Sequence, residues 1–139
     1  MRTIDETKDI LEKLFEKWIE PLGLKWWNIT LSWISDPLSV INEFGGNPNG
    51  TVLARTYVNW EYISAKITIN LIDMNEEEES KLESYVVHEL MHILINEMRE
   101  ESHKHEERVA TSLQKAFMWV REYGEREGAN ELHTDQTQF

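Results

Sequence analysis

The 139-residue chain contains no cysteine, which excludes both disulfide bonds and thiolate metal sites. The absence is also compatible with the reducing environment of the cytosol. No apolar run reaches the length of a transmembrane helix, and the N-terminal residues 1–6 lack a signal-peptide pattern. We therefore expect a cytoplasmic protein that does not insert into a membrane.

Basic residues are scarce, because 14 Lys and Arg stand against 26 Asp and Glu and give a net charge of −12. Such a negative surface repels phosphates, which argues against non-specific binding of nucleic acid or of an anionic membrane. The charge favours solubility. The sequence leaves the oligomeric state open.

The length and composition are those of one soluble globular domain. A chain of 139 residues can bury a core without covalent crosslinks. Hydrophobic residues make up 40% and charged residues 29%, which is an ordinary balance for a soluble domain. We expect a single domain over residues 1–124, followed by a polar C-terminal tail over residues 125–139.

Hydrophobic periodicity predicts an α+β fold. Apolar and polar residues alternate from Trp27 to Trp33, which is typical of a half-buried strand. The short connection over residues 60–62 predicts that the second and third strands form an antiparallel hairpin. Asn75, followed by Glu78, predicts a capping box at the start of the next helix. The expected elements are a helix over 5–20, strands over 27–33, 51–60 and 63–71 in an antiparallel or mixed sheet, a helix over about 76–98 and a last helix over about 105–123.

The most informative segment is His88-Glu89-Leu90-Met91-His92. Residues four apart lie on one face of a helix, so His88 and His92 can direct imidazole nitrogens at one metal ion. Glu89 lies beside them, where it can take a proton from a water molecule activated by the metal. Neutral imidazoles suit Zn²⁺, which also tolerates an open ligand position.

The residues around this motif argue against a chance occurrence. The segment is apolar on every side, and a helix that is apolar all round is expected to be buried. Buried histidines and a buried glutamate need polar partners, and a metal ion supplies them. The apolar neighbours are Val86, Val87, Leu90, Met91, Ile93, Leu94 and Ile95.

A catalytic zinc site needs a third protein ligand from another part of the chain. An extension of the motif to a third histidine fails, because the positions concerned hold Ile95 and Met98. A glutamate at the start of the last helix is the alternative. The apolar stripe of that helix favours Glu106 as the inward residue. The stripe consists of Val109, Leu113, Ala116, Phe117 and Val120.

The motif, together with the segment Glu107-Arg108-Val109-Ala110-Thr111-Ser112-Leu113, resembles the gluzincin-type metallopeptidases. The resemblance is to small members of phage and mobile-element type, in particular the ImmA/IrrE-type peptidases. It implies a minimal zincin-like domain in which Glu107 is the third zinc ligand between the two C-terminal helices. It also implies that an edge strand lines the cleft and pairs with an extended substrate. The chain departs from the pattern at Thr111, which stands where an acidic or amide residue usually orients a ligand histidine.

We therefore expect a zinc-dependent peptidase that acts on a protein or peptide substrate, with Glu89 as general base and His88, His92 and Glu107 as metal ligands. The alternative is a non-catalytic zinc-containing module of a phage or mobile element, with a binding or structural role. The intact Glu89 argues against the alternative, because a purely structural site needs no base.

Other side chains are candidates for lesser roles. His103 and His105 are within reach of the site as ligands or as groups that stabilise an oxyanion. Four tyrosines are candidate hydrogen-bond donors to a tetrahedral intermediate, although a core or packing role is the favoured interpretation of each. These are Tyr57, Tyr62, Tyr85 and Tyr123.

Overall fold

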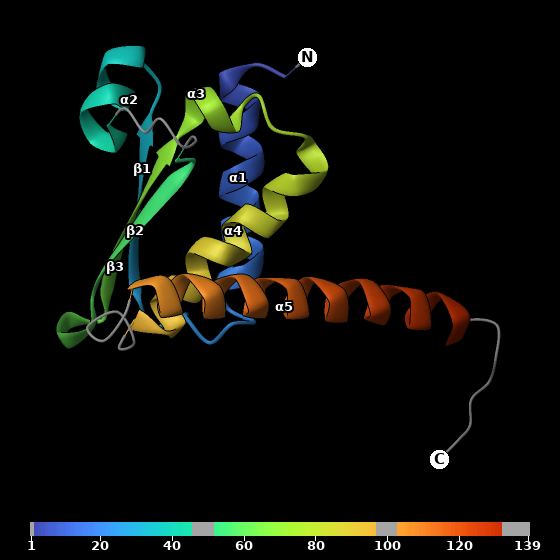
Figure 1. Ribbon diagram of the computed structural model, residues 1–139. Coiled ribbons are helices and arrows are strands. Elements are labelled where there is room, and N and C mark those ends of the chain that lie inside the picture. Colours follow the sequence, from blue (N-terminus) through green and yellow to red (C-terminus); the bar gives the residue numbers. More distant parts are fainter. Residues whose placement is uncertain (1, 46–51, 97–102, 132–139) are drawn as a thin grey trace.

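The computed structural model describes residues 2–45, 52–96 and 103–131, with the side chains of 103–105 and 126–131 left out (Figure 1). The fold is α+β, as expected. The elements in chain order are α1 (Ile4–Ile19), β1 (Asn28–Ile34), α2 (Pro37–Phe44), β2 (Ala54–Asn59), the 3-10 turn η1 (Trp60–Tyr62), β3 (Ser64–Asn70), α3 (Leu71–Met74), α4 (Glu79–Leu94) and α5 (His103–Glu131).

The three strands form one mixed sheet in the order β1-β3-β2. β2 and β3 are antiparallel and joined by η1, so the predicted hairpin is confirmed. β1 runs parallel to β3, with Leu31 opposite Ile67. The central strand β3 is the most buried of the three, and β1 and β2 are the two edges.

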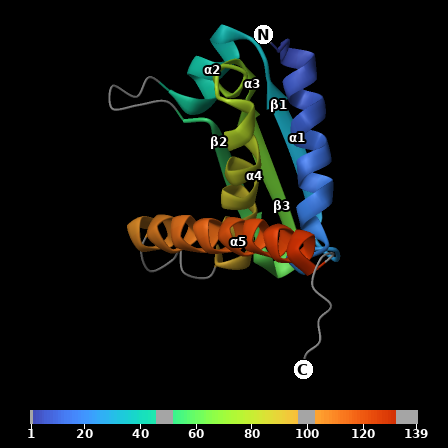
Figure 2. The same cartoon turned by 90° about the vertical axis from the view of Figure 1, so that its right-hand side faces the viewer.

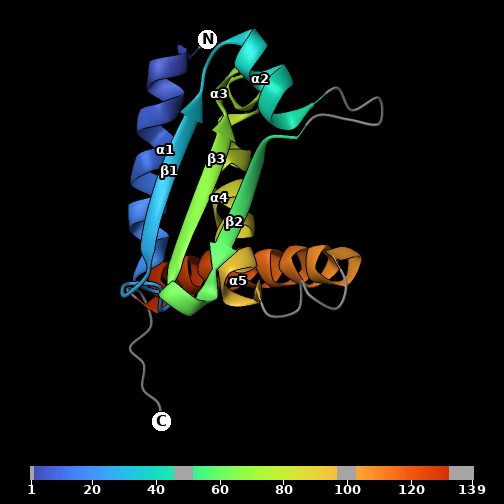
Figure 3. The ribbon, with the colours of Figure 1, turned by 90° about the vertical axis from the view of Figure 1, so that its left-hand side faces the viewer.

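The long helices α1 and α4 lie on one face of this sheet, and the short helix α2 lies at one end of the other side, where the Arg55 side chain of β2 stacks on Phe44. Figure 3 shows the strands in front, with α1 and α4 behind them. Because side chains alternate along a strand, the odd-numbered residues of β1 and β3 face the helices and the even-numbered ones face away. The core contains Leu11, Phe15, Ile67, Ile69, Leu82, Val86, Val87, Leu90, Met91 and Ile93.

Local signals explain where α1 and α2 begin. Thr3 accepts a hydrogen bond from the Glu6 backbone, and the Glu6 side chain accepts one from Thr3 in return, which completes a capping box. Asp36 caps α2 by accepting from the Ser39 backbone nitrogen at 2.9 Å, and Pro37 takes the first helical position. Residues Pro37–Phe44 therefore form a complete helix, and residues 46–51 lie outside the described part of the chain.

The start of α4 differs from the sequence prediction. The helix begins at Glu79, and the capping box of Asn75 with Glu78 is wrong, because Asn75 ends α3. The Asn75 side-chain oxygen instead accepts a hydrogen bond from the Thr7 hydroxyl of α1 at 2.5 Å. Asn75 is therefore engaged in holding α1 against the α3–α4 connection.

The last helix also differs from expectation. α5 continues to Glu131 instead of ending near Tyr123, so part of the expected tail is helical. It lies across one end of α4 (Figures 1 and 2), and its C-terminal half extends past the other helices (Figure 1). Val109 and Leu113 of the expected stripe are partly covered, whereas Ala116, Phe117 and Val120 are exposed.

Within the part of the chain that the structure describes, no helix combines the length and the apolar content that crossing a membrane requires.

Candidate metal centre

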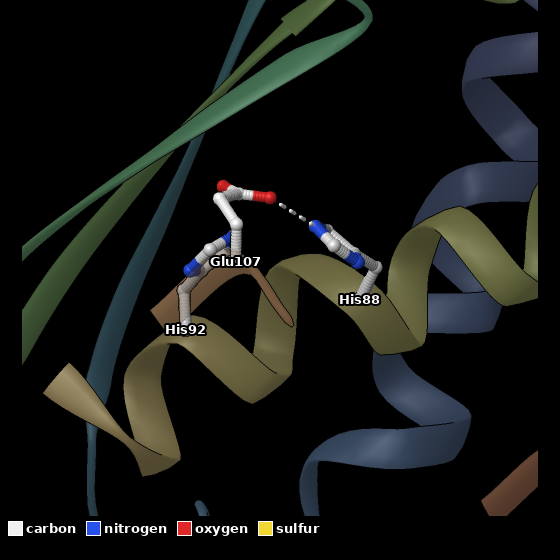
Figure 4. A group of neighbouring side chains, drawn as sticks. All are labelled: His88, His92 and Glu107. Atoms are coloured by element: carbon white, nitrogen blue, oxygen red, sulfur yellow. Dashed lines mark ion pairs between the residues drawn. The ribbon is translucent and has the colours of Figure 1, made fainter. Parts of the chain in front are cut away.

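The site lies where α4 packs against α5 and against the edge strand β2. The apolar residues of α4 bury most of the helix, as the sequence predicts, although Leu94 at its end is 42% exposed. His88 and His92 lie one turn apart on the side of α4 that faces the start of α5. Figure 4 shows their rings and the Glu107 carboxylate directed at a common point.

The structure brings together the three residues expected to bind a metal. Nε2 of His88 lies 3.3 Å from one oxygen of Glu107, and Nε2 of His92 lies 3.1 Å from the other. One potential ligand atom from each residue falls within 4.8 Å of the other two. His92 is buried and His88 and Glu107 are half-buried, so the cluster is open on one side.

Each imidazole also has a partner on its second nitrogen. Nδ1 of His92 lies 2.6 Å from Oε1 of Glu106, whose side chain is almost completely buried. Nδ1 of His88 lies 2.9 Å from Oε1 of Gln114. Both partners are on α5, so residues of this helix contact both ring nitrogens of each histidine.

These contacts fix the tautomers of the histidines. An ionised carboxylate and an amide oxygen only accept hydrogen bonds, so Nδ1 of His88 and of His92 must carry the hydrogen. A neutral ring then presents the lone pair of Nε2 to the oxygens of Glu107. Lone pairs facing one another repel unless protons or a cation lie between them. The donor set therefore fits a divalent metal ion, because one ion relieves the repulsion at all three residues.

The residue expected to act as a base lies in the same pocket. Glu89 is hydrogen-bonded by the Thr56 hydroxyl of β2, with 2.7 Å between Oγ1 and Oε1. Burial raises the pKa of the Glu89 carboxyl, against the opposing effects of the Thr56 hydrogen bond and of the two histidines. A carboxyl in this position can accept a proton and later return it.

The pocket around these groups has a volume of about 770 Å³. One wall is the segment Val52–Thr56, which includes the start of the edge strand β2. The opposite wall belongs to α4 and α5, and Thr111 and Gln114 contribute to it. Of the two hairpin strands that could line a cleft, only β2 is an edge, since β3 lies between its neighbours.

The secondary candidates are mostly placed elsewhere. Tyr57, Tyr62 and Tyr123 are exposed and do not line the pocket. Tyr85 does line it, but its hydroxyl donates to Glu77, and burial together with this bond raises the pKa of Tyr85 to about 12. The side chains of His103 and His105, at the start of α5, lie outside the described part of the structure.

Sequence reasoning missed three contacts at the site, namely those of Thr56 with Glu89, of Gln114 with His88 and of Glu106 with Nδ1 of His92. Gln114 could have been found, because it follows Glu107 by seven residues and so shares its face of α5. Glu106 was considered only as a rival ligand. Thr56 gives no local signal, since its contact with Glu89 depends on how β2 packs against α4.

No family model, curated protein or solved structure matches this chain, so the interpretation of the pocket rests on the geometry of His88, Glu89, His92 and Glu107.

Proposed function

We propose that the protein is a zinc-dependent peptidase with a zincin-like active site. The observation that carries the proposal is the position of Glu89, which lies in the same pocket as a two-histidine, one-glutamate cluster. A structural metal site has no use for a free carboxyl beside its ligands, whereas a hydrolytic site requires one.

The separation of the ligand atoms supports zinc as the metal. Ligands at about 2.0–2.2 Å in tetrahedral geometry lie roughly 3.3 Å from one another. The two Nε2-to-oxygen distances in the cluster, 3.3 and 3.1 Å, are close to that value, although each involves a different oxygen of Glu107 and the ligand atoms as a set lie within 4.8 Å. Two neutral imidazoles and a carboxylate also leave one position of a tetrahedral site for water, as in catalytic zinc sites.

In this mechanism His88, His92 and Glu107 hold the metal. When bound, zinc supplies Lewis-acid chemistry, lowering the pKa of a water molecule to about 7 and polarising a peptide carbonyl. Glu89 accepts a proton from the attacking water as the new carbon–oxygen bond forms. Glu89 then returns the proton to the leaving amine as the carbon–nitrogen bond breaks, which yields a carboxylic acid and an amine that ionise to a carboxylate and an ammonium group. Thr56 holds one Glu89 oxygen, which orients the carboxyl between these two transfers.

The proposed substrate is an extended protein or peptide segment. β2 pairs with β3 on one side, and among the described residues no strand pairs with its other side, which borders the pocket. A segment added along this edge would hydrogen-bond to the backbone and pass in front of Glu89. This arrangement favours recognition of main chain, so the side-chain preference comes from the pocket walls.

The test compares the native protein with Glu89→Gln on a mixture of peptides derived from a whole proteome, with cleavage products identified by mass spectrometry. The amide is nearly isosteric but cannot act as a base, so the rate should fall by about 10²–10⁴-fold. Zinc content, measured by elemental analysis, should stay at one ion per chain. Glu79→Gln makes the same change at the exposed start of α4 and serves as the matched control.

Cleavage by Glu89→Gln at the native rate would overturn the assigned role of the base. If the native protein binds zinc but cleaves nothing in the mixture, the non-catalytic binding module becomes the better description.

A further inference from the structure

The C-terminal half of α5 carries an apolar surface that the domain does not cover. Trp119 is 60% exposed, Val120 59%, Tyr123 47% and Phe117 37%. The rings of Trp119 and Tyr123 stack at a centroid distance of 5.0 Å, so the two side chains form one flat surface. An exposed aromatic cluster of this kind on a small soluble domain usually marks an interaction site.

The opposite side of the same helix makes the contacts with the domain. Met118 packs against the core, and Arg121 pairs with Glu83 of α4 at 3.0 Å. The apolar surface is therefore the outward side of a helix that is already anchored, and docking would not require α5 to rearrange. Figure 1 shows this part of α5 projecting beyond the other helices.

The outward side has the spacing of a two-helix interface. Ala116, Trp119 and Tyr123 recur at intervals of three and four residues, the pattern by which one helix packs along another. Lys115 and Glu122 are exposed, lie seven residues apart and so border the stripe on the same flank.

We propose that the occupant of this surface is α5 of a second copy of the chain, packed antiparallel and centred near Trp119. In an antiparallel pair, a flank of one helix faces the same flank of the other. Lys115 of each copy then lies opposite Glu122 of its partner, so two ion pairs form by symmetry. In a parallel arrangement, the two copies of Lys115 would lie at the same height along the helix axes, and so would the two copies of Glu122. No ion pair between Lys115 and Glu122 would then form.

The area of this surface determines how tightly the two copies are expected to bind. A fully buried aromatic side chain contributes about 150–250 Å², and the two on this stripe, Trp119 and Tyr123, are already partly covered. Two copies together would bury well under the roughly 1,200 Å² of a standard stable interface. The dimer should therefore be weak, with a dissociation constant in the micromolar range or above, and its population should depend on protein concentration.

The experiment is sedimentation equilibrium of the full chain from about 10 µM to about 1 mM, in buffered physiological salt. The native protein should shift from monomer to dimer across this range. Lys115→Glu and Glu122→Lys alone each replace two opposite-charge pairs with two like-charge pairs, and each should weaken the dimer about tenfold or more. The double variant Lys115→Glu/Glu122→Lys restores opposite charges and should recover the native dissociation constant.

Lys66→Glu on the sheet and Glu12→Lys on α1 are controls, because they change the net charge equally at exposed positions away from α5. A native protein that stays monomeric at every concentration would refute the proposal. So would a dimer that both single reversals leave unchanged, or that the double variant fails to restore. The measurement involves no metal or substrate, so its result is independent of the proposed peptidase activity.

Discussion

Glu106 and Glu107 are adjacent in the sequence, but their carboxylates contact different nitrogens of His92. Glu107 faces Nε2 at 3.1 Å and Glu106 faces Nδ1 at 2.6 Å. The apolar periodicity of α5 favours Glu106, and the segment that resembles the gluzincins favours Glu107. In the structure, both carboxylates contact the ring of His92. Glu106 is the inward residue and Glu107 lies at the flank, directed at the cluster.

We predict that Glu107→Ala weakens zinc binding more than Glu106→Ala does, because the first removes a ligand and the second removes only its support. Loss of such a supporting hydrogen bond typically costs about 10–100-fold in metal affinity. Gln114→Ala should have a smaller effect, since an amide is a weaker acceptor than a carboxylate. Competition titration against a chromophoric zinc chelator measures all three. If Glu106→Ala were the most damaging of the three, our assignment of the ligand would be wrong.

A strained residue lies at the opposite end of the hairpin from the start of β2. Ile63 has a φ of 51° and a ψ of 46°, in the left-handed region that a β-branched side chain strongly disfavours. Ile63→Gly removes a strain of about 1–2 kcal/mol but adds chain flexibility, and the net gain should be about 0.5–1 kcal/mol. Ile63 is 46% exposed and is not among the residues packed against the core, so we expect the gain to exceed the packing that is lost. Thermal unfolding followed by circular dichroism should show a higher Tm, and a lower Tm would show that Ile63 contributes more packing than strain.

At the scale of elements, Glu83 connects three helices. Its carboxylate accepts hydrogen bonds from Lys17 and from the Trp18 indole of α1, and it pairs with Arg121 of α5. Burial of Glu83 acts to raise its pKa, but these donors and charges outweigh burial and hold the pKa below its ordinary value. The group therefore stabilises the fold in its charged form.

We predict that Glu83→Gln lowers the free energy of unfolding by about 1 kcal/mol at neutral pH, since the amide keeps the shape but loses the charge-assisted bonds. A lowered folded-state pKa gives stability that is present above the unfolded value of about 4.3 and is lost as the pH falls through the folded value. The difference between the native protein and Glu83→Gln should thus shrink in acid below about pH 4. Urea unfolding at several pH values measures it, and a difference that persists undiminished at pH 2 would exclude this cause.

The elements that local patterns describe well could be predicted from the sequence. The spacing of His88 and His92 places both on one helical face whatever surrounds them, and the alternation in residues 63–71 specifies a buried strand. The predictions that fail, or that could not be made, concern side chains whose partners are distant in the sequence. Asn75 resembles an N-cap, but Thr7, 68 positions earlier, binds its side chain. Likewise, nothing near Thr56 indicates that it will contact Glu89, because β2 and α4 meet only in the folded chain.

At the scale of the whole molecule, most of the core lies away from the candidate metal centre. The core packs α1 and α4 onto the sheet and includes Ala110 of α5, whereas the centre joins α4 to the start of α5. Bound metal is therefore expected to stabilise the domain without being necessary for its folding, in contrast to the small zinc modules that unfold when the metal is removed.

We predict that excess zinc raises the Tm by roughly 10 °C over the chelated protein, because ligand at 100 times its dissociation constant adds about 2.7 kcal/mol to the free energy of unfolding. The chelated protein should keep a cooperative transition. In His88→Ala and in His92→Ala, zinc should no longer shift the Tm. Differential scanning calorimetry measures both the Tm and the cooperativity of unfolding. If zinc raised the Tm of the two variants as much as it raises that of the native protein, the bound zinc would lie elsewhere.

The edge strand β1 has a consequence for how the protein behaves when concentrated. All seven residues from Asn28 to Ile34 are uncharged, and among the described residues no strand pairs with the outer edge of β1. Natural proteins commonly protect such an edge with lysine or proline, and this strand has neither. The remaining protection is the mutual repulsion of chains that each carry a net charge of −12. Salt shortens the range of that repulsion from about 8–10 Å at physiological ionic strength to about 3 Å at 1 M, so high ionic strength lowers the barrier to strand-to-strand aggregation through β1.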